Sequence, residues 1–186
     1  PQFALFISVT GAGNQGFNPF AVGSGTGGET GDYSLAIVQS TQAEFASVTN
    51  NSISNHTPEN VSVGEPLRRD IGKDGTVDVG ADDIDIYKFD SAFNGTLTVR
   101  TDTSDEDSAD TFLRVFDAAG NEIAFNNNAT DATTASLLSF SVVAGSTYYI
   151  GVNGASNNAR AYNPLTGDGA ASGSEGHYTL SLEVTG

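Results

Sequence analysis

The chain has 186 residues, enough for one domain and part of a second, and 38% of them are hydrophobic. Its 23 acidic side chains outnumber 7 basic ones and give a formal net charge of −16, which argues against nucleic acid or an anionic membrane as a partner. The absence of cysteine excludes disulfides and thiolate metal sites, and no apolar run approaches the roughly 20 residues of a membrane span.

Short runs of Val, Ile, Thr, Tyr and Phe between Gly, Asn, Asp and Ser clusters predict many short strands joined by turns. The predicted strands cover residues 61–67, 76–79, 85–90, 95–101, 111–117, 122–126, 136–143, 147–153 and 177–184. Residues 117–121 are expected to form a hairpin turn in which Gly120 or Asn121 takes a positive φ. Strands at this spacing predict an all-β fold, a jelly-roll-like antiparallel β-sandwich.

The beginning of the chain resembles its end. Pro19 and Pro164 are 145 residues apart, as are Tyr33 and Tyr178, while Ile7 and Ile150 are 143 apart. The second copy therefore carries a two-residue insertion in the loop between its strands. Further matches are Val9/Val152, Gly11/Gly154, Asn14/Asn157, Asn18/Asn163, Gly31/Gly176 and Leu35/Leu180.

This repeat divides the chain into three parts. Residues 1–39 are interpreted as the C-terminal end of a preceding repeat, which packs on the main domain, completes it or does neither. Residues 40–60 are a polar connector, and residues 61–186 are the sandwich. Because the chain begins Pro-Gln-Phe-Ala and contains no Met, we expect an interior fragment of a longer multidomain protein, with the sandwich monomeric in it.

Three segments in order resemble the bacterial pre-peptidase C-terminal domain family: 83–89 (DIDIYKF), 110–122 (DTFLRVFDAAGNE) and 146–152 (STYYIGV). The ending, YNP at 162–164 and GHYTL at 176–180, is similar to the family's longer variants. The resemblance implies a β-sandwich that accompanies secreted proteases or occurs in large calcium-dependent adhesins. His177 departs from the family pattern, which has Asp at this position, whereas Asp32 keeps it in the upstream copy.

The densest acidic segment, residues 102–110, holds five carboxylates within nine residues. Such groups repel one another when packed together, and a calcium ion with several oxygen ligands would relieve this repulsion. The spacing is not that of an EF-hand, and a solvated acidic hairpin tip is the alternative. The candidate ligands here are Asp102, Asp105, Asp107 and Asp110.

Two further groups of oxygen ligands are predicted. Asp83 and Asp85 lie on one face of a strand, because side chains alternate with a period of two, so one cation could bridge both. Asn127 and Asp131 follow a predicted strand and could supply ligands at the same end of the sandwich as Asp110; an ordinary turn is the alternative. The predicted cofactor is Ca²⁺.

The loop between residues 153 and 176 is longer than a simple connection requires, and such loops often carry function. It offers a stacking face and polar groups suited to a peptide or saccharide; the alternative is that Tyr162 packs as a lid on the core. The candidate ligand-binding residues are Asn157, Asn158, Arg160, Tyr162, Asn163 and Asp168.

No organised catalytic set is recognisable, because the two histidines have neither a Ser-His-Asp context nor an HExxH motif. We therefore expect no enzyme and no catalytic residue. The expected function is a calcium-dependent adhesion module of a secreted or surface-bound bacterial protein, which binds a peptide or glycan on another cell or matrix. The alternatives are a non-catalytic accessory domain of a secreted protease and a structural spacer repeat.

Overall fold

The computed structural model describes residues 51–54, 58–74, 77–103 and 107–185. The predicted segment 1–39, part of the predicted connector and Asp105 lie outside these residues. Within the described part of the chain, no helix is long and apolar enough to cross a membrane.

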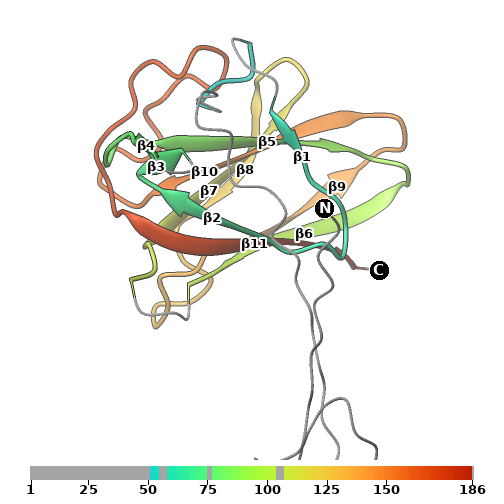
Figure 1. The fold of residues 1–186 in the computed structure, drawn as a ribbon. Helices are drawn as coiled ribbons and strands as arrows, with labels where there is room; N and C mark the ends of the chain where they lie inside the picture. The colour runs from blue at the N-terminus through green and yellow to red at the C-terminus, as the bar shows by residue number, and fades with distance from the viewer. Residues whose placement is uncertain (1–50, 55–57, 75–76, 104–106, 186) are drawn as a thin grey trace, which may run out of the picture. The chain divides into compact units, whose positions relative to one another are not determined.

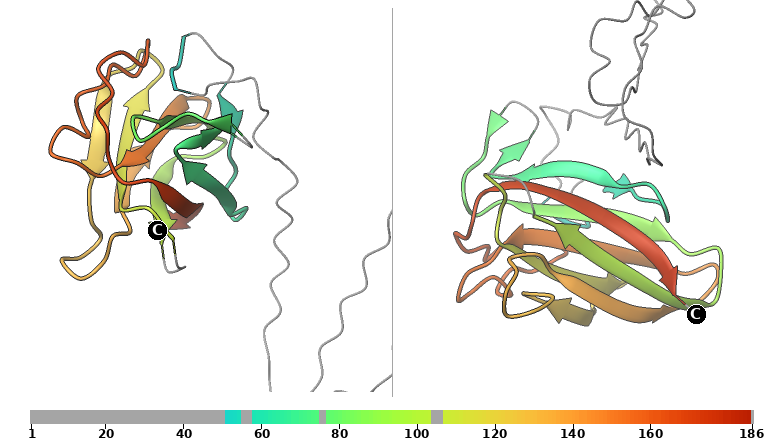
Figure 2. Two further views of the ribbon diagram at one scale, coloured as in Figure 1. Left: turned by 60° about the vertical axis from the view of Figure 1, so that its left-hand side comes forward. Right: turned by 90° about the horizontal axis from the view of Figure 1, so that it is seen from below.

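The described residues form an all-β sandwich of two sheets, as the sequence predicts (Figure 1). In chain order the strands are β1 (Glu59–Asn60), β2 (Leu67–Ile71), β3 (Lys73–Asp74), β4 (Val77–Asp78), β5 (Ile84–Asp90), β6 (Gly95–Asp102), β7 (Thr111–Asp117), β8 (Glu122–Asn126), β9 (Leu137–Val142), β10 (Thr147–Gly154) and β11 (Gly176–Thr185). One sheet has the order β1–β5–β10–β7–β8 and the other β2–β11–β6–β9, and two further views show them packed face to face (Figure 2). Strands β3 and β4 form a small separate hairpin beside the start of β5 (Figure 1).

The pairing of the strands is antiparallel, with one exception among the described residues. Strand β1 runs parallel to β5, with Glu59 opposite Tyr87, so the antiparallel sandwich carries a short parallel pair at this edge. Residues 51–54 also contact the fold, because the Ile53 N–H donates to the Pro164 carbonyl at 2.8 Å. The sandwich thus includes part of the predicted connector.

Most predicted strand boundaries agree with the structure to within one residue. Strands β7 and β8 have the predicted ends, and β4, β5, β6, β9, β10 and β11 differ by a single residue at one or both ends. The turn between β7 and β8 is also as expected, because Gly120 has a φ of +81°. The Asp117 carboxylate supports this turn by accepting the N–H groups of Ala119 and Asn121, each at 2.9 Å.

The predicted strand at 61–67 is wrong except for its last residue. Gly64 has a φ of +79° and Pro66 has no N–H, so this stretch turns and makes only single backbone bonds to the sheets, such as that from the Val61 N–H to the Lys88 carbonyl. The next strand after β1 is β2, and its charged sequence LRRDI gives no alternating apolar signal. Arg69 in β2 is nevertheless buried, because its guanidinium donates to both carboxylate oxygens of Glu59 in β1 at 2.7 Å.

Two apolar clusters lie on opposite faces of the first sheet. On β5, Tyr87 and Phe89 face the second sheet and join the main core, whereas Ile84 and Ile86 face away from it. The outward pair packs with Phe116 of β7 and with Tyr162. The loop between β10 and β11 therefore covers the outer face of this sheet instead of extending from it.

Candidate metal centre

Three aspartates meet beside the β3–β4 hairpin. Asp74 ends β3, Asp83 immediately precedes β5, and Asp85 is the second residue of β5. One carboxylate oxygen from each lies within 4.8 Å of the others, and the three residues are only 3%, 2% and 0% exposed. Within the described residues, no other group of three acidic or histidine side chains comes this close.

Local backbone geometry places these carboxylates. Gly72 has a φ of +97°, a conformation that glycine adopts readily, and its N–H donates to Asp83 Oδ2 at 2.8 Å. The Val79 N–H donates to the Gly72 carbonyl at 3.0 Å, which closes the β3–β4 hairpin at its open end. The expectation that Asp83 and Asp85 share one face is confirmed, since their carboxylates converge.

The other sheet contributes a tyrosine to the same cluster. Tyr178 of β11 donates its hydroxyl to Asp85 Oδ2 at 2.5 Å and also contacts the Tyr87 hydroxyl. Burial, reinforced by the Asp85 charge, raises the pKa of Tyr178 well above its usual value, so this hydroxyl stays protonated and remains a donor. Tyr178 thereby orients Asp85 from across the sandwich.

Asp83 has unused bonding capacity within this cluster. Its Oδ1 is buried and has no hydrogen-bond partner among the described residues. The pKa of Asp83 is raised from 3.8 to about 6, chiefly by burial and also by the nearby Asp74 charge, against the opposing bond from the Gly72 N–H. An unsatisfied buried carboxylate oxygen is costly, which makes this atom the natural ligand for a cation.

The donor set fits a hard divalent cation. Calcium binds oxygen atoms at about 2.3–2.6 Å, so ligands on opposite sides of one ion lie about 5 Å apart, compatible with the 4.8 Å spread here. The remaining positions in its shell of 6–8 oxygens are commonly filled by carbonyl groups and water. Asp74, Asp83 and Asp85 would supply the charge that such an ion requires.

A solvent-open cavity of about 460 Å³ adjoins this cluster through Gly72, which lines it. Its lining carries four acidic side chains and few basic groups: Asp70, Asp78, Asp107 and Glu175, with Lys73 and His177. His177 Nδ1 contacts the Asp70 carboxylate, so the side chain that stands where the resembled family has Asp lies against an acid. The cavity would favour a positively charged occupant.

The structure separates the predicted ligands of the acidic segment 102–110. Asp102 is exposed and lies 3.9 Å from Arg100, whereas Asp107 has a φ of +66° and lines the cavity. Asp110 is partly buried, which raises its pKa. Asp131 is exposed and Asn127 accepts a bond from Ser136 through its backbone carbonyl. Their role as calcium ligands stays a prediction.

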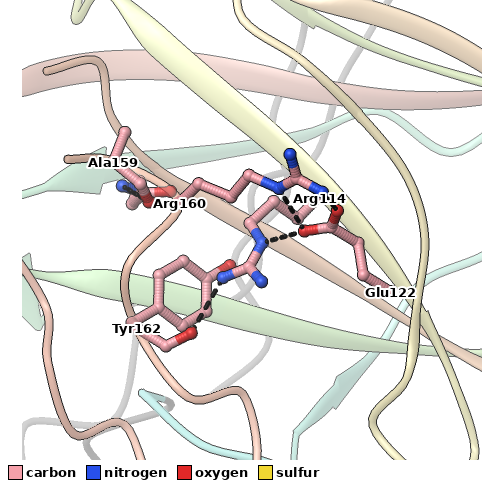
Figure 3. A network of polar contacts seen from close by, with 6 residues as sticks. Arg114, Glu122, Ala159, Arg160 and Tyr162 are labelled. Carbon is pink, nitrogen blue, oxygen red and sulfur yellow. Dashed lines mark hydrogen bonds and ion pairs between the residues drawn. The ribbon is translucent and has the colours of Figure 1, made fainter. Parts of the chain in front are cut away.

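The structure gives the long loop an internal anchor (Figure 3). Tyr162 is 2% exposed, and the Arg114 guanidinium lies 4.3 Å from its ring centroid and donates to its carbonyl at 2.9 Å. Glu122 accepts bonds from both Arg114 and Arg160, and Arg160 lies 3.8 Å from the Phe125 ring centroid. The stacking face of Tyr162 is therefore occupied from within, as the alternative interpretation expected.

The other predicted ligand-binding residues of this loop are on the surface. Asn157 and Asn158 are exposed, while Asn163 and Asp168 stabilise the loop itself. Asn163 accepts the Leu165 N–H at 2.9 Å, and Asp168 accepts the Thr166 hydroxyl at 2.9 Å. Ligand binding by these residues stays a prediction, and at Asn163 and Asp168 it would compete with these bonds.

Asp74 is the member of the cluster that the sequence analysis does not predict. Its only local signal is the dipeptide Asp74-Gly75, a common turn sequence between two strands. What brings it to Asp83 is the folding of the hairpin back onto the start of β5, and no periodic pattern encodes that contact.

No family model matches the sequence, and no curated protein sequence matches it. Among solved structures, the chain is similar to the pre-peptidase C-terminal domain of collagenase from Bacillus anthracis, with 16% identity and a TM-score of 0.45, over 69% of this chain and 100% of that one. It is also similar to PliG of Aeromonas hydrophila, a periplasmic inhibitor of g-type lysozyme, with 16% identity and a TM-score of 0.44, over 69% of this chain and 96% of that one. The first of these structures is a domain of the family that the sequence resembles.

Proposed function

We propose that the chain is a non-catalytic, calcium-stabilised β-sandwich module of a secreted or surface-bound protein and binds a peptide or saccharide. The observation that carries the calcium site is the buried convergence of Asp74, Asp83 and Asp85, with Asp83 Oδ1 lacking a hydrogen-bond partner among the described residues. A bound cation would neutralise repulsion that burial otherwise intensifies.

The cavity beside this site supports a peptide ligand over a neutral saccharide. Its lining carries more carboxylates than cationic groups, and a cleft of one charge concentrates ligands of the opposite charge. A peptide with a lysine or arginine side chain has the complementary charge. The module would then hold its fold with calcium and its partner with the adjoining cavity.

Calcium should raise the melting temperature of the full chain. A ligand that binds only the folded state stabilises it by mass action, and extracellular calcium sites commonly have dissociation constants of about 0.1–1 mM. At about 5 mM calcium this corresponds to roughly 1–2 kcal/mol, or several degrees in a thermal melt. Melts in calcium and in chelator, followed by circular dichroism, measure the increment.

Substitutions at two of the three aspartates test whether they bind the calcium that raises the melting temperature. Asp83→Asn and Asp74→Asn should fold in chelator at least as stably as the parent chain, because each removes a buried repulsive charge, yet should lose most of the response to calcium. Glu183→Gln, a change at an exposed acid that is not among the predicted ligands, is the control and should keep the full response. Equal calcium increments in all four proteins would refute the assignment of the site.

A further inference from the structure

The structure shows which strands the downstream copy of the internal repeat forms. The downstream copy, from Tyr148 to Glu183, comprises β10, the long loop and β11. Strand β10 lies between β5 and β7 in one sheet, and β11 lies between β2 and β6 in the other. The repeated sequence therefore supplies a central strand to each sheet, together with the loop that covers the first sheet.

The upstream copy has apolar residues wherever the downstream copy faces the core. The downstream residues at these positions are all buried. The pairs, downstream residue first, are Tyr148/Leu5, Ile150/Ile7, Val152/Val9, Tyr178/Tyr33, Leu180/Leu35 and Leu182/Ile37. Burial of such side chains is the main favourable term in folding, so the upstream sequence has the core residues that these two strand positions require.

Three glycines that cannot carry a side chain are also retained. A Cβ on Gly154 would collide with the Ser174 backbone, and one on Gly173 would collide with the Gly154 backbone. Gly176 has a φ of +134°, and a Cβ there would collide with the Asp107 carbonyl. The upstream counterparts of the three are Gly11, Gly28 and Gly31. At the less crowded Gly167 the counterpart is Val22, so the loop tip differs between the copies.

Two differences between the copies offset each other: one adds side-chain atoms where the other removes one. A Cβ on Gly151 would overlap the hydroxyl of Tyr162, which packs directly over this strand. The upstream copy has Ser8 in place of Gly151 and Phe17 in place of Tyr162. Removal of the hydroxyl makes room for the serine Cβ, whose other close neighbours, at 3.2 and 3.3 Å, are side-chain ends able to shift slightly.

We propose that residues 5–38 are the closing segment of another copy of this sandwich, adapted to the places that β10 and β11 occupy here. Its partner is a segment equivalent to residues 51–147 of a neighbouring repeat. The described sandwich has both places filled by its own strands, so the proposed partner of the segment is a second copy. The parent protein then contains sandwiches of this type in tandem.

A transplant tests the proposal in the full chain. Residues 148–182 are replaced by residues 5–37, and unfolding is followed by circular dichroism and urea denaturation. We expect a chimera with one cooperative transition and a β-sheet spectrum like that of the parent. A chimera that remains unfolded would overturn the proposal.

A double-mutant cycle provides the matched control in the native sequence. Gly151→Ser alone should lower the melting temperature by several degrees, whereas Tyr162→Phe alone should change it little, because the buried hydroxyl has no hydrogen-bond partner among the described residues. The double variant has the residue types of Ser8 and Phe17 in the upstream copy and should recover most of the lost melting temperature. Additive effects would contradict the proposed fit.

Discussion

Asp83 is held in an environment that opposes its ionisation. Burial is the largest cause of its raised pKa, and the Asp74 carboxylate adds to it, while the Gly72 N–H only partly compensates. The same features that make the site unfavourable without a cation make it favourable with one. The stability of the chelated protein should therefore depend on pH through this residue.

The sign of that dependence follows from the pKa of about 6 in the folded state against 3.8 as the ordinary value. The stabilising contribution of protonated Asp83 is fully present below about pH 4 and is lost as the pH rises to about 6, for a change of up to about 3 kcal/mol. In chelator, melting temperatures should show this loss, and Asp83→Asn should remove it. The same slope in the variant would contradict the assignment.

At the scale of elements, Glu122 on β8 anchors the β10–β11 loop through two arginines of different exposure. The Arg114 side chain is 7% exposed and the Arg160 side chain is 54% exposed. Burial opposes the charge of Glu122, but the bonds from Arg160 and Arg114 outweigh it and hold the pKa of this carboxyl below its usual value. The two ion pairs should therefore differ in their contribution to stability.

Glu122→Ala should destabilise the protein strongly, by roughly 3 kcal/mol, because it leaves the Arg114 charge buried without its carboxylate. Arg160→Ala should cost less than about 1 kcal/mol, since exposed ion pairs contribute little. Urea denaturation of the two variants measures both values. Equal losses of unfolding free energy in the two variants would show that the burial of Arg114 does not determine how much Glu122 contributes to stability.

Local sequence predicts some elements of this fold better than others. Strands β7 and β8 are predicted to the residue, because the apolar residues of β7 and the turn at Gly120 that separates the two strands agree with each other. Strand β2 is missed because its buried position is occupied by Arg69, which depends on Glu59 from another sheet. A charged residue can be buried only with a partner, and the pairing of distant strands lies beyond local periodicity.

At the scale of the whole molecule, the net charge of −16 and the acidic cavity act together on ligands. Short peptides that contain Lys or Arg should bind at least about tenfold more tightly than the same peptides with Gln, and the difference should shrink as NaCl is raised from about 0.02 M to 0.5 M. Fluorescence anisotropy in calcium measures both effects.

Variants relate this preference to the cavity. Glu175→Gln and Asp78→Asn should weaken the binding of the basic peptides, because both residues line the cavity. Glu65→Gln removes an exposed charge that does not line the cavity and should leave the affinity unchanged. Equal affinity for basic and Gln-containing peptides would refute the peptide assignment, and a saccharide that binds with calcium would replace it.

The sequence by itself determined the all-β class, eight of the strands to within a residue and the shared face of Asp83 and Asp85, because turn chemistry and a period of two are local properties. Only the tertiary structure decided that Asp74 joins these two aspartates, that Tyr178 reaches Asp85 from the opposite sheet, and that Tyr162 turns into the protein. Local periodicity specifies which face a side chain occupies. Which distant segment lies against that face depends on the packing of the whole chain.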